Sequence, residues 1–215
     1  MTRCDGSRLV DGPEASDTTI LLAHGAGAPM DSDWMSTMAE GLGACGLRVV
    51  RFEFPYMQRS RELGRRCGPD RLPKLLDAYR DEVSRERQHS PESSLIIGGK
   101  SLGGRIASLL IDALPEVQAC LCLGYPFHPP GKPESLRTEH LKVMRSPCLV
   151  LQGERDSFGK RDEVEQYALA PSVELAWLPS GDHSFTPTKA SGLSQAENLA
   201  AAIDQCRRFI SRQVG

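Results

Sequence analysis

Short apolar runs recur along the chain, separated by segments with helical spacing, and this alternation most constrains the fold. Most runs have apolar residues at consecutive positions, which is typical of strands buried on both faces. The predicted strands are Thr18–Ala23, Leu47–Phe52, Leu95–Ile97, Ala119–Leu123, Cys148–Gln152 and Val173–Leu178. The predicted helices are Asp33–Cys45, Arg71–Glu86, Ser101–Leu114, Arg161–Leu169 and Ser194–Arg212. This order predicts an α/β fold with a mainly parallel, doubly wound sheet of about six to seven strands.

The length of 215 residues suits one domain, and we find no internal repeat, low-complexity tract or long linker. We therefore predict a single domain over residues 1–215. Residues 1–17 are polar and irregular, with a candidate edge strand at Arg8–Val10. About 25 residues separate the strand Ala119–Leu123 from the strand Cys148–Gln152. That is too short for a large helical cap, so the cap is expected to be minimal and the pocket open.

The bulk composition excludes several classes of partner. A formal charge of -2 and a pI near 6.2 give no basic field for nucleic acid or for an anionic membrane. No apolar run approaches the length of a membrane-spanning helix, and the N-terminus lacks the apolar core of a signal peptide. We expect a soluble, cytoplasmic protein. The sequence makes no prediction of its oligomeric state.

A glycine-rich turn follows the third predicted strand directly. The sequence Gly99-Lys100-Ser101-Leu102-Gly103 has the G-x-S-x-G spacing of a nucleophile elbow, a sharp strand-to-helix turn that exposes a serine. The turn brings the chain close to itself, so positions 99 and 103 tolerate little side chain. Two alternatives are a turn that only packs the helix on the strand, and a cradle for an anion at a helix N-terminus. Lys100 is expected to be solvated or paired with a carboxylate.

Two residues needed for nucleophilic catalysis follow later strands in the expected order. Asp156 comes after the run Cys148–Gln152, and His183 comes after Val173–Leu178. In the predicted triad, His183 takes the proton of Ser101, and Asp156 orients and stabilises the imidazole. Glu154 and Asp162 are local competitors for the acidic position.

The loop after Thr18–Ala23 reads His24-Gly25-Ala26-Gly27-Ala28, and its small residues let a substrate approach the main chain. We expect the oxyanion hole to be formed by the backbone amides of Ala26 and Leu102, with Gly25 as a neighbour in the substrate site. His24 is expected to stabilise this loop by a hydrogen bond rather than to act as a base.

Several residues just past strand ends are candidates for the pocket wall: Tyr56, Met57, Phe127 and His128. For the first three the alternative is core packing, and for His128 it is a rigid turn with a hydrogen-bonding side chain. A basic stretch holds Arg59, Arg61, Arg65, Arg66 and Arg71, with Arg51 upstream. It is either a solvated face or a border of the crevice that favours an acidic acyl substrate or an anionic partner.

Seven cysteines are scattered and mostly lie in apolar segments, as reduced core thiols do. Cys120 and Cys122 share one side of a strand, but no second pair follows at zinc spacing. No metal and no cofactor is expected.

The chain resembles the α/β-hydrolase superfamily, and within it the small dienelactone-hydrolase-like branch with little lid. The resemblance rests on His24–Gly27, Arg51–Tyr56, Gly98–Arg105, the proline-rich segment at 124–134 and Gly181–His183. It extends to the hydrolase-like domains of a testis-expressed protein and of a subunit of the NSL histone-acetyltransferase complex. The resemblance implies the fold and the triad positions. Dienelactone hydrolases proper use a cysteine nucleophile, and this chain has Ser101 instead.

The leading functional hypothesis is a serine hydrolase that cleaves an ester or related acyl bond of a small soluble substrate through an acyl-enzyme intermediate. Two alternatives stay open at this stage. One is a catalytically silent binding or scaffold module with the same fold. The other is an acyltransferase that uses the same three residues.

Overall fold

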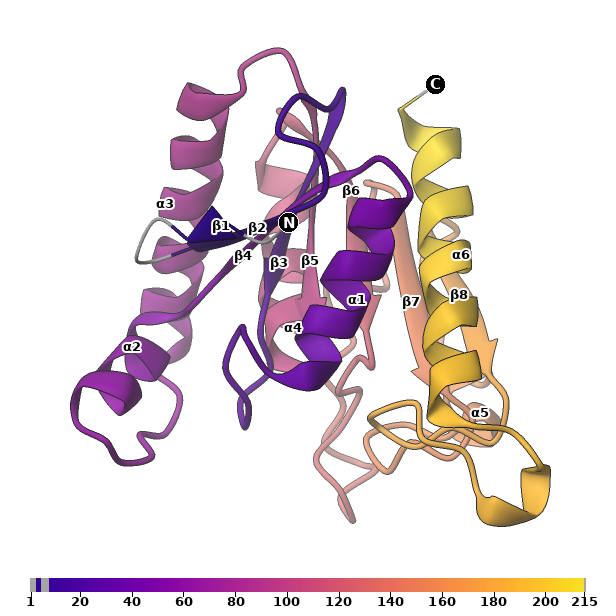
Figure 1. The fold of residues 1–215 in the computed structure, drawn as a ribbon. Coiled ribbons are helices and arrows are strands. Elements are labelled where there is room, and N and C mark those ends of the chain that lie inside the picture. Colours follow the sequence, from indigo (N-terminus) through magenta and orange to yellow (C-terminus); the bar gives the residue numbers. More distant parts are fainter. Residues whose placement is uncertain (1–2, 5–7, 215) are drawn as a thin grey trace.

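The computed structural model describes residues 3–4 and 8–214, and its strands form one sheet in the order β1-β2-β4-β3-β5-β6-β7-β8 (Figure 1). The strands are β1 Arg3–Cys4, β2 Arg8–Asp11, β3 Thr18–Ala23, β4 Arg48–Phe52, β5 Ser94–Lys100, β6 Val117–Leu123, β7 Cys148–Gly153 and β8 Val173–Leu178. β3 to β8 pair in parallel, whereas β1 and β2 pair antiparallel at the edge. The predicted α/β class is confirmed. The expected edge strand is present as β2, and the two-residue β1 is an additional strand.

Helices cover both faces of the sheet, with α1 and α6 in front of it in Figure 1 and α4 behind. The helices are α1 Asp33–Ala44, α2 Pro55–Glu62, α3 Leu72–His89, α4 Leu102–Leu110, α5 Arg161–Val164 and α6 Gln195–Gln213, with the short 3-10 helices Ile111–Ala113 and Lys189–Ser191. α6 begins with the capping box that its sequence indicates: the Glu197 amide donates to the Ser194 hydroxyl, and the Ser194 amide donates to the Glu197 carboxylate.

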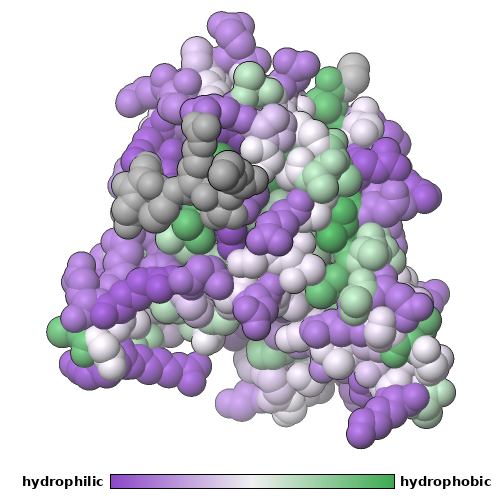
Figure 2. Space-filling view, in the orientation of Figure 1, coloured by the Kyte–Doolittle hydropathy of each residue, from purple (hydrophilic) through white to green (hydrophobic). Residues whose placement is uncertain are grey.

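Consecutive apolar residues in the central strands pack alternately into two separate hydrophobic cores, one on each face of the sheet. In β3, Leu21 packs with the residues of α3 and α4, whereas Ile20 and Leu22 pack with those of α1 and α6. A strand buried on both faces therefore needs an unbroken apolar run. Figure 2 shows the outer surface over α1 and α6, where apolar side chains gather along the seam between the two helices and polar ones surround it.

One predicted helix is shorter in the structure, and one helix of the structure was not predicted. The expected helix Arg161–Leu169 is only the four-residue α5, because the chain turns away after Val164. Conversely, α2 begins at Pro55 within a segment for which no helix was expected. Proline favours the first position of a helix, since its fixed backbone angle suits the helix and its missing N–H has no helical partner there.

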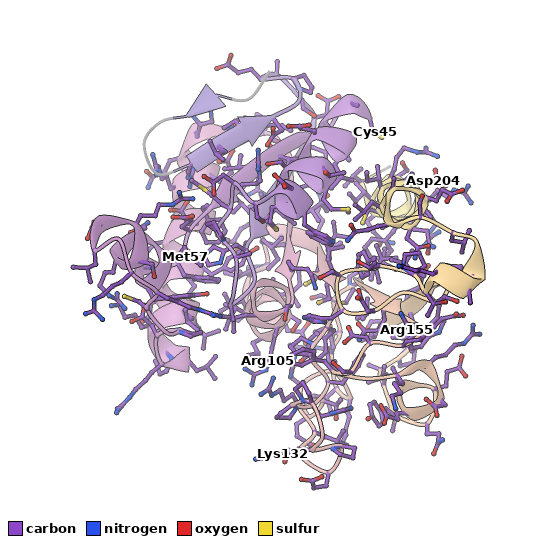
Figure 3. The ribbon with its side chains drawn as sticks, turned by 60° about the horizontal axis from the view of Figure 1, so that its bottom comes forward. Cys45, Met57, Arg105, Lys132, Arg155 and Asp204 are labelled. Atoms are coloured by element: carbon purple, nitrogen blue, oxygen red, sulfur yellow. The ribbon has the colours of Figure 1, made fainter. Side chains whose placement is uncertain are left out.

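The carboxyl ends of the parallel strands face one side of the molecule, which Figure 3 turns toward the reader. Ala23 at the end of β3 pairs with Gly99 near the end of β5, so the loops after these two strands lie side by side. Residues 124–147, all of them described, form turns and bends without a helix, in keeping with a minimal cap. Across the described residues, none of the helices combines the length and hydropathy of a membrane span.

Candidate active site

Ser101 lies in the turn between β5 and α4 with a backbone conformation that only a tight turn imposes. Its φ of 50° and ψ of -108° are rare for a residue with a side chain. The flanking glycines allow the turn to close. A Cβ at Gly99 or at Gly103 would come within 2.5 Å of the Ala23 carbonyl oxygen. The close approach expected from the sequence is therefore present.

Two hydrogen bonds connect Ser101 to His183 and His183 to Asp156. The Ser101 Oγ lies 2.9 Å from His183 Nε2, and His183 Nδ1 lies 2.7 Å from Asp156 Oδ2. Asp156 is fully buried, whereas about a quarter of the His183 side chain is exposed. This geometry lets the imidazole take a proton from the serine while the carboxylate stabilises the resulting charge.

Three donors hold the Asp156 carboxylate in place. Besides His183, the Phe158 amide donates to Oδ1 at 2.9 Å, and the side-chain amide of Gln152 donates to Oδ2 at 2.9 Å. The competing acids lie elsewhere. Glu154 accepts hydrogen bonds from the Ser180 amide and from an arginine, and Asp162 is exposed on α5.

Gln152 is a residue of the site that the sequence analysis did not single out. It is fully buried at the end of β7, and its Oε1 accepts a 2.7 Å hydrogen bond from the Tyr125 amide while its amide nitrogen reaches Asp156. A polar residue at the end of an otherwise apolar strand, four positions before Asp156, was the available signal. Gln152 therefore links the loop after β6 to Asp156.

The loop after β3 leaves backbone amides available near Ser101. Among the described residues, no acceptor is found for the amides of Ala26 and Leu102, the two predicted oxyanion-hole donors. His24 holds this loop. The Phe54 amide donates to its Nε2 at 3.1 Å, so its Nδ1 carries the proton and donates to the Gly25 carbonyl at 2.6 Å. Burial lowers the pKa of His24, which keeps this ring neutral.

Lys100 is buried beside the serine, which corrects the expectation of a solvated or carboxylate-paired lysine. Its ammonium donates a hydrogen bond to the backbone carbonyl of His183 and lies 5.3 Å from the centre of the Trp34 ring and 5.7 Å from that of Phe185. Loss of hydration on burial lowers the pKa of Lys100 to about 8.

A cavity of about 300 Å³, hereafter the first cavity, opens beside Ser101 and His183. Its other lining residues include Gly25, Ala26 and Gly27 from the loop after β3, Lys100, and the apolar side chains of Trp34, Met35 and Phe158. Gly25 thus lines the same cavity as Ser101 and His183. The size and mixed lining are typical of a site for a small molecule.

The other predicted wall residues lie outside the first cavity. Tyr56 is fully buried and its hydroxyl donates to the Gly25 carbonyl at 3.3 Å, so it supports the loop from behind. Phe127 packs in the core against Tyr125. His128 is buried, and its Nε2 lies 3.3 Å from the Glu163 carboxylate, as in the rigid-turn alternative.

Met57 lines a second cavity of about 350 Å³, which shares Ala26 and Gly27 with the first. Two arginines of the basic stretch and the upstream Arg51 are already paired with carboxylates. The ion pairs are Arg51–Asp11, Arg59–Asp70 and Arg61–Glu53. Arg65 and Arg66 line the second cavity and have no carboxylate partner among the described residues.

Three thiols meet in the core, which the scattered spacing did not indicate. The sulfur atoms of Cys120, Cys122 and Cys148 all lie within 4.8 Å of one another, and all three residues are buried. Such a cluster could hold a soft metal ion only as thiolates. Burial raises the pKa of Cys120, whereas hydrogen bonds with Cys120 and Cys122 lower the pKa of Cys148 to about 5, so the cluster favours one thiolate beside protonated thiols.

Comparison with known proteins identifies the fold family. The chain is similar to an α/β serine hydrolase without lid from Xanthomonas campestris, with a TM-score of 0.72, 22% identity, and coverage of 95% of this chain and 88% of that one. It is also similar to a dienelactone hydrolase from Anabaena variabilis, with a TM-score of 0.72, 20% identity, and coverage of 99% and 96%. A family model for the alpha/beta hydrolase domain matches residues 16–211. The chain therefore belongs to the alpha/beta hydrolase family.

Proposed function

We propose that this protein is a serine hydrolase that cleaves an ester or related acyl bond of a small substrate. The observation that carries the proposal is the hydrogen-bonded series Ser101–His183–Asp156, with the serine on a strained elbow that opens into the first cavity. Nucleophile, base and orienting acid are then within hydrogen-bond reach of one another, which is the arrangement that acyl transfer requires.

In the proposed reaction, Ser101 Oγ attacks the carbonyl carbon as His183 Nε2 takes its proton. The carbonyl oxygen becomes an oxyanion, and the free amides of Ala26 and Leu102 donate hydrogen bonds to it. His183 then gives the proton to the leaving alcohol, so the carbon–oxygen bond of the ester breaks and an acyl-enzyme remains. A water molecule, deprotonated by His183, repeats the sequence and releases the acid.

The reaction class is supported by the two fold neighbours, an α/β serine hydrolase without lid at 22% identity and a dienelactone hydrolase at 20% identity. We propose that this chain belongs to the small, lid-poor branch that resembles dienelactone hydrolase, and the similarity to that enzyme supports this proposal. The absence of a helix between β6 and β7 in the described chain supports an open site that admits short acyl groups.

Labelling with a fluorophosphonate probe tests the proposal directly. Native protein should form a covalent adduct on Ser101, located by peptide mass spectrometry, and Ser101→Ala should form none. Ser108→Ala is the matched control, because Ser108 Oγ also lies 2.9 Å from a histidine, His140, but lines neither cavity described beside the site. That variant should label like the native protein.

Absence of labelling in the native protein, or equal labelling of Ser101→Ala, would mean that the pocket is catalytically silent and the proposal is wrong. If Ser101 is labelled, the native protein is next incubated with short-chain esters and the products are identified. Release of the free acid supports hydrolysis, whereas transfer of the acyl group to an added alcohol or amine with no release of acid identifies an acyltransferase.

A further inference from the structure

The second cavity lies next to the predicted reaction centre. It is bordered by the loop after α2, and it meets the first cavity at Ala26 and Gly27. A substrate whose reacting carbonyl contacts the Ala26 amide therefore has the second cavity directly beside it. Its lining includes the apolar side chains of Met57 and Pro29 and the guanidinium groups of Arg61, Arg65 and Arg66.

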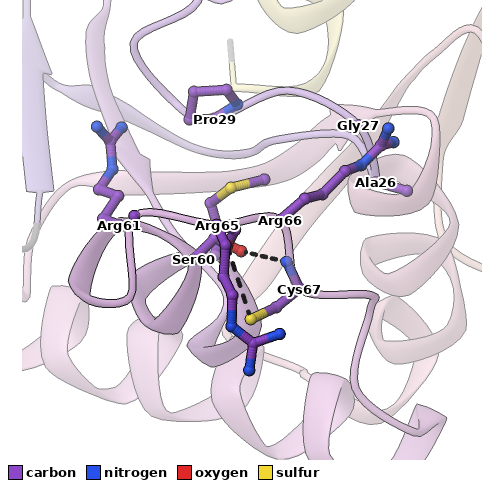
Figure 4. A pocket seen from close by; sticks show the side chains of 10 residues that line it. Ala26, Gly27, Pro29, Ser60, Arg61, Arg65, Arg66 and Cys67 are labelled. Carbon is purple, nitrogen blue, oxygen red and sulfur yellow. Dashed lines mark hydrogen bonds between the residues drawn. The ribbon is translucent and has the colours of Figure 1, made fainter.

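Arg66 is the arginine directed at this junction. Its side chain runs toward Gly27 and Ala26 (Figure 4), and one guanidinium nitrogen lies 3.5 Å from the place that a Cβ on Gly27 would occupy. Arg65 also lines the cavity, but its guanidinium points the other way in Figure 4. The glycine thus leaves space in which a ligand can reach the Arg66 guanidinium.

The loop that carries Arg66 is held to α2 on both sides of this residue. The Arg65 amide donates to the Ser60 carbonyl at 3.2 Å, and the Cys67 amide donates to the Ser60 Oγ at 2.9 Å. Ser60 Oγ in turn donates to the Tyr56 carbonyl within the helix. The backbone on either side of Arg66 is therefore fixed before any ligand binds, which reduces the entropy lost on binding.

The charge of Arg66 is not neutralised by the acids around it. Arg61 binds both Glu53 and Asp31. Asp70 is shared by Arg59 and Lys74. Each of these acids already has a cation, and none of them lines the second cavity. The cavity therefore presents a positive charge and main-chain amides to its contents, a combination that favours an anion.

We propose that Arg66 binds an anionic group of the substrate, so that the preferred substrates are esters carrying a carboxylate a few bonds from the reacting carbonyl. The inference rests on the proposed function for the position of that carbonyl. The carboxylate would accept hydrogen bonds from the guanidinium while the hydrocarbon between the two groups contacts Met57.

Matched esters test the charge preference. The 4-nitrophenyl monoester of adipic acid is compared with 4-nitrophenyl hexanoate, and the hexanoate ester of 4-hydroxybenzoate with phenyl hexanoate. These pairs place the carboxylate on the acyl side or on the alcohol side. The native protein should favour the charged member of at least one pair by about tenfold in kcat/KM at low ionic strength, as for a charge-assisted hydrogen bond at a partly exposed site. The preference should fall as salt is added.

Arg66→Gln should abolish this preference, because kcat/KM should fall about tenfold for the charged esters and much less for the neutral ones. Arg71→Gln is the control, because it removes the same charge from the same segment, and Arg71 lines neither cavity. It should keep the preference. Equal kcat/KM values within both pairs for the native protein overturn the inference. So does a preference that survives in Arg66→Gln, or an equal loss for charged and neutral esters.

Binding to the Ser101→Ala variant separates this inference from the proposed function. Calorimetry with the four intact esters requires no turnover. Tighter binding of a charged ester, lost in the Ser101→Ala, Arg66→Gln double variant, supports the anion site even if the native protein hydrolyses none of them. Equal affinities for charged and neutral esters overturn the anion site even if the native protein proves to be an active esterase.

Discussion

At the scale of single residues, Gln152 shows how the acid of the candidate triad is held. Its side chain is fully buried and bridges the backbone of Tyr125 to the Asp156 carboxylate. An apolar side chain of similar size would fill the space but would leave the Tyr125 amide without an acceptor. It would also remove one of the donors that fix the carboxylate.

We therefore expect Gln152→Leu to lower the free energy of unfolding by about 1–3 kcal/mol, the cost of leaving a buried polar group unpaired. Because Asp156 would orient His183 less strictly, kcat for a short ester should fall by about tenfold or more with little change in KM. Urea unfolding and steady-state kinetics measure the two effects. Gln166→Leu, at an exposed glutamine, should change neither. Native-like kcat in Gln152→Leu would show that Asp156 is held without this contact.

The sequence alone led to Ser101, Asp156 and His183 because each follows a buried run, and parallel strands bring their carboxyl ends to one edge. The buried positions of the Gln152 and Lys100 side chains were not predicted, and the reason is the same for both. The direction of a polar side chain at a strand end depends on its contacts with loops from distant parts of the chain. Those contacts cannot be inferred from the residues next to it in the sequence. Phe127 and His128 illustrate the reverse, since they follow a strand yet turn into the interior.

At the scale of elements, Lys100 connects the end of β5 to the loop that carries His183. The buried ammonium donates to the His183 carbonyl, and the pKa of this lysine is lowered to about 8 because burial removes its hydration. In the unfolded chain the pKa of lysine is about 10.4. Between these two values the unfolded chain binds one more proton than the folded protein. The contribution of Lys100 to stability is therefore greatest above the higher pKa and is lost as the pH falls through 8.

The free energy of unfolding should accordingly rise by about 1–2 kcal/mol between pH 7.5 and 9.5 in native protein relative to Lys100→Met. Urea unfolding of both proteins at the two pH values measures this difference. The comparison stops below pH 10, because burial raises the pKa values of Tyr56, Tyr79 and Tyr125, and their titration has the opposite sign. Lys142→Met, at a more exposed lysine, serves as the control. Parallel pH profiles for native protein and Lys100→Met would contradict the assignment.

Helices and strands could be predicted where their buried residues give a clear apolar pattern in the sequence. The β3 and β8 boundaries match the apolar runs, and α6 matches its capping box. The short polar elements were not predictable in this way. α2 buries only Tyr56 and Met57, so its sequence carries little helical periodicity, and its proline is equally typical of a turn. α5 ends at Val164, although the spacing of its sequence predicted a helix as far as Leu169.

At the scale of the whole molecule, a buried group of charges ties the sheet edge to a covering helix. Glu86 of α3 accepts hydrogen bonds from Arg48 of β4 and from Arg8 of β2, and its side chain is 1% exposed. Arg48 lies at the start of its parallel strand, whereas the candidate active site lies at the carboxyl ends. Arg48 therefore lies at the opposite end of β4 from the candidate site, whereas Arg8 pairs in register with Phe52 at the carboxyl end of that strand.

Replacing Glu86 by leucine leaves Arg48 buried without its carboxylate partner, so we expect Glu86→Leu to lower the free energy of unfolding by about 3–5 kcal/mol. Glu165→Leu breaks an ion pair with Arg161 in which both side chains are about half exposed. That change should cost no more than about 1 kcal/mol, because water already solvates both charges. Urea unfolding at neutral pH compares the two variants with the native protein.

Well below its melting temperature, Glu86→Leu should still be labelled at Ser101 at the native rate, because the loops that form the site remain intact. Equal losses of stability in the two variants would mean that the buried group contributes no more than a surface ion pair. Slower labelling of folded Glu86→Leu would mean that the buried ion group and the candidate site are coupled.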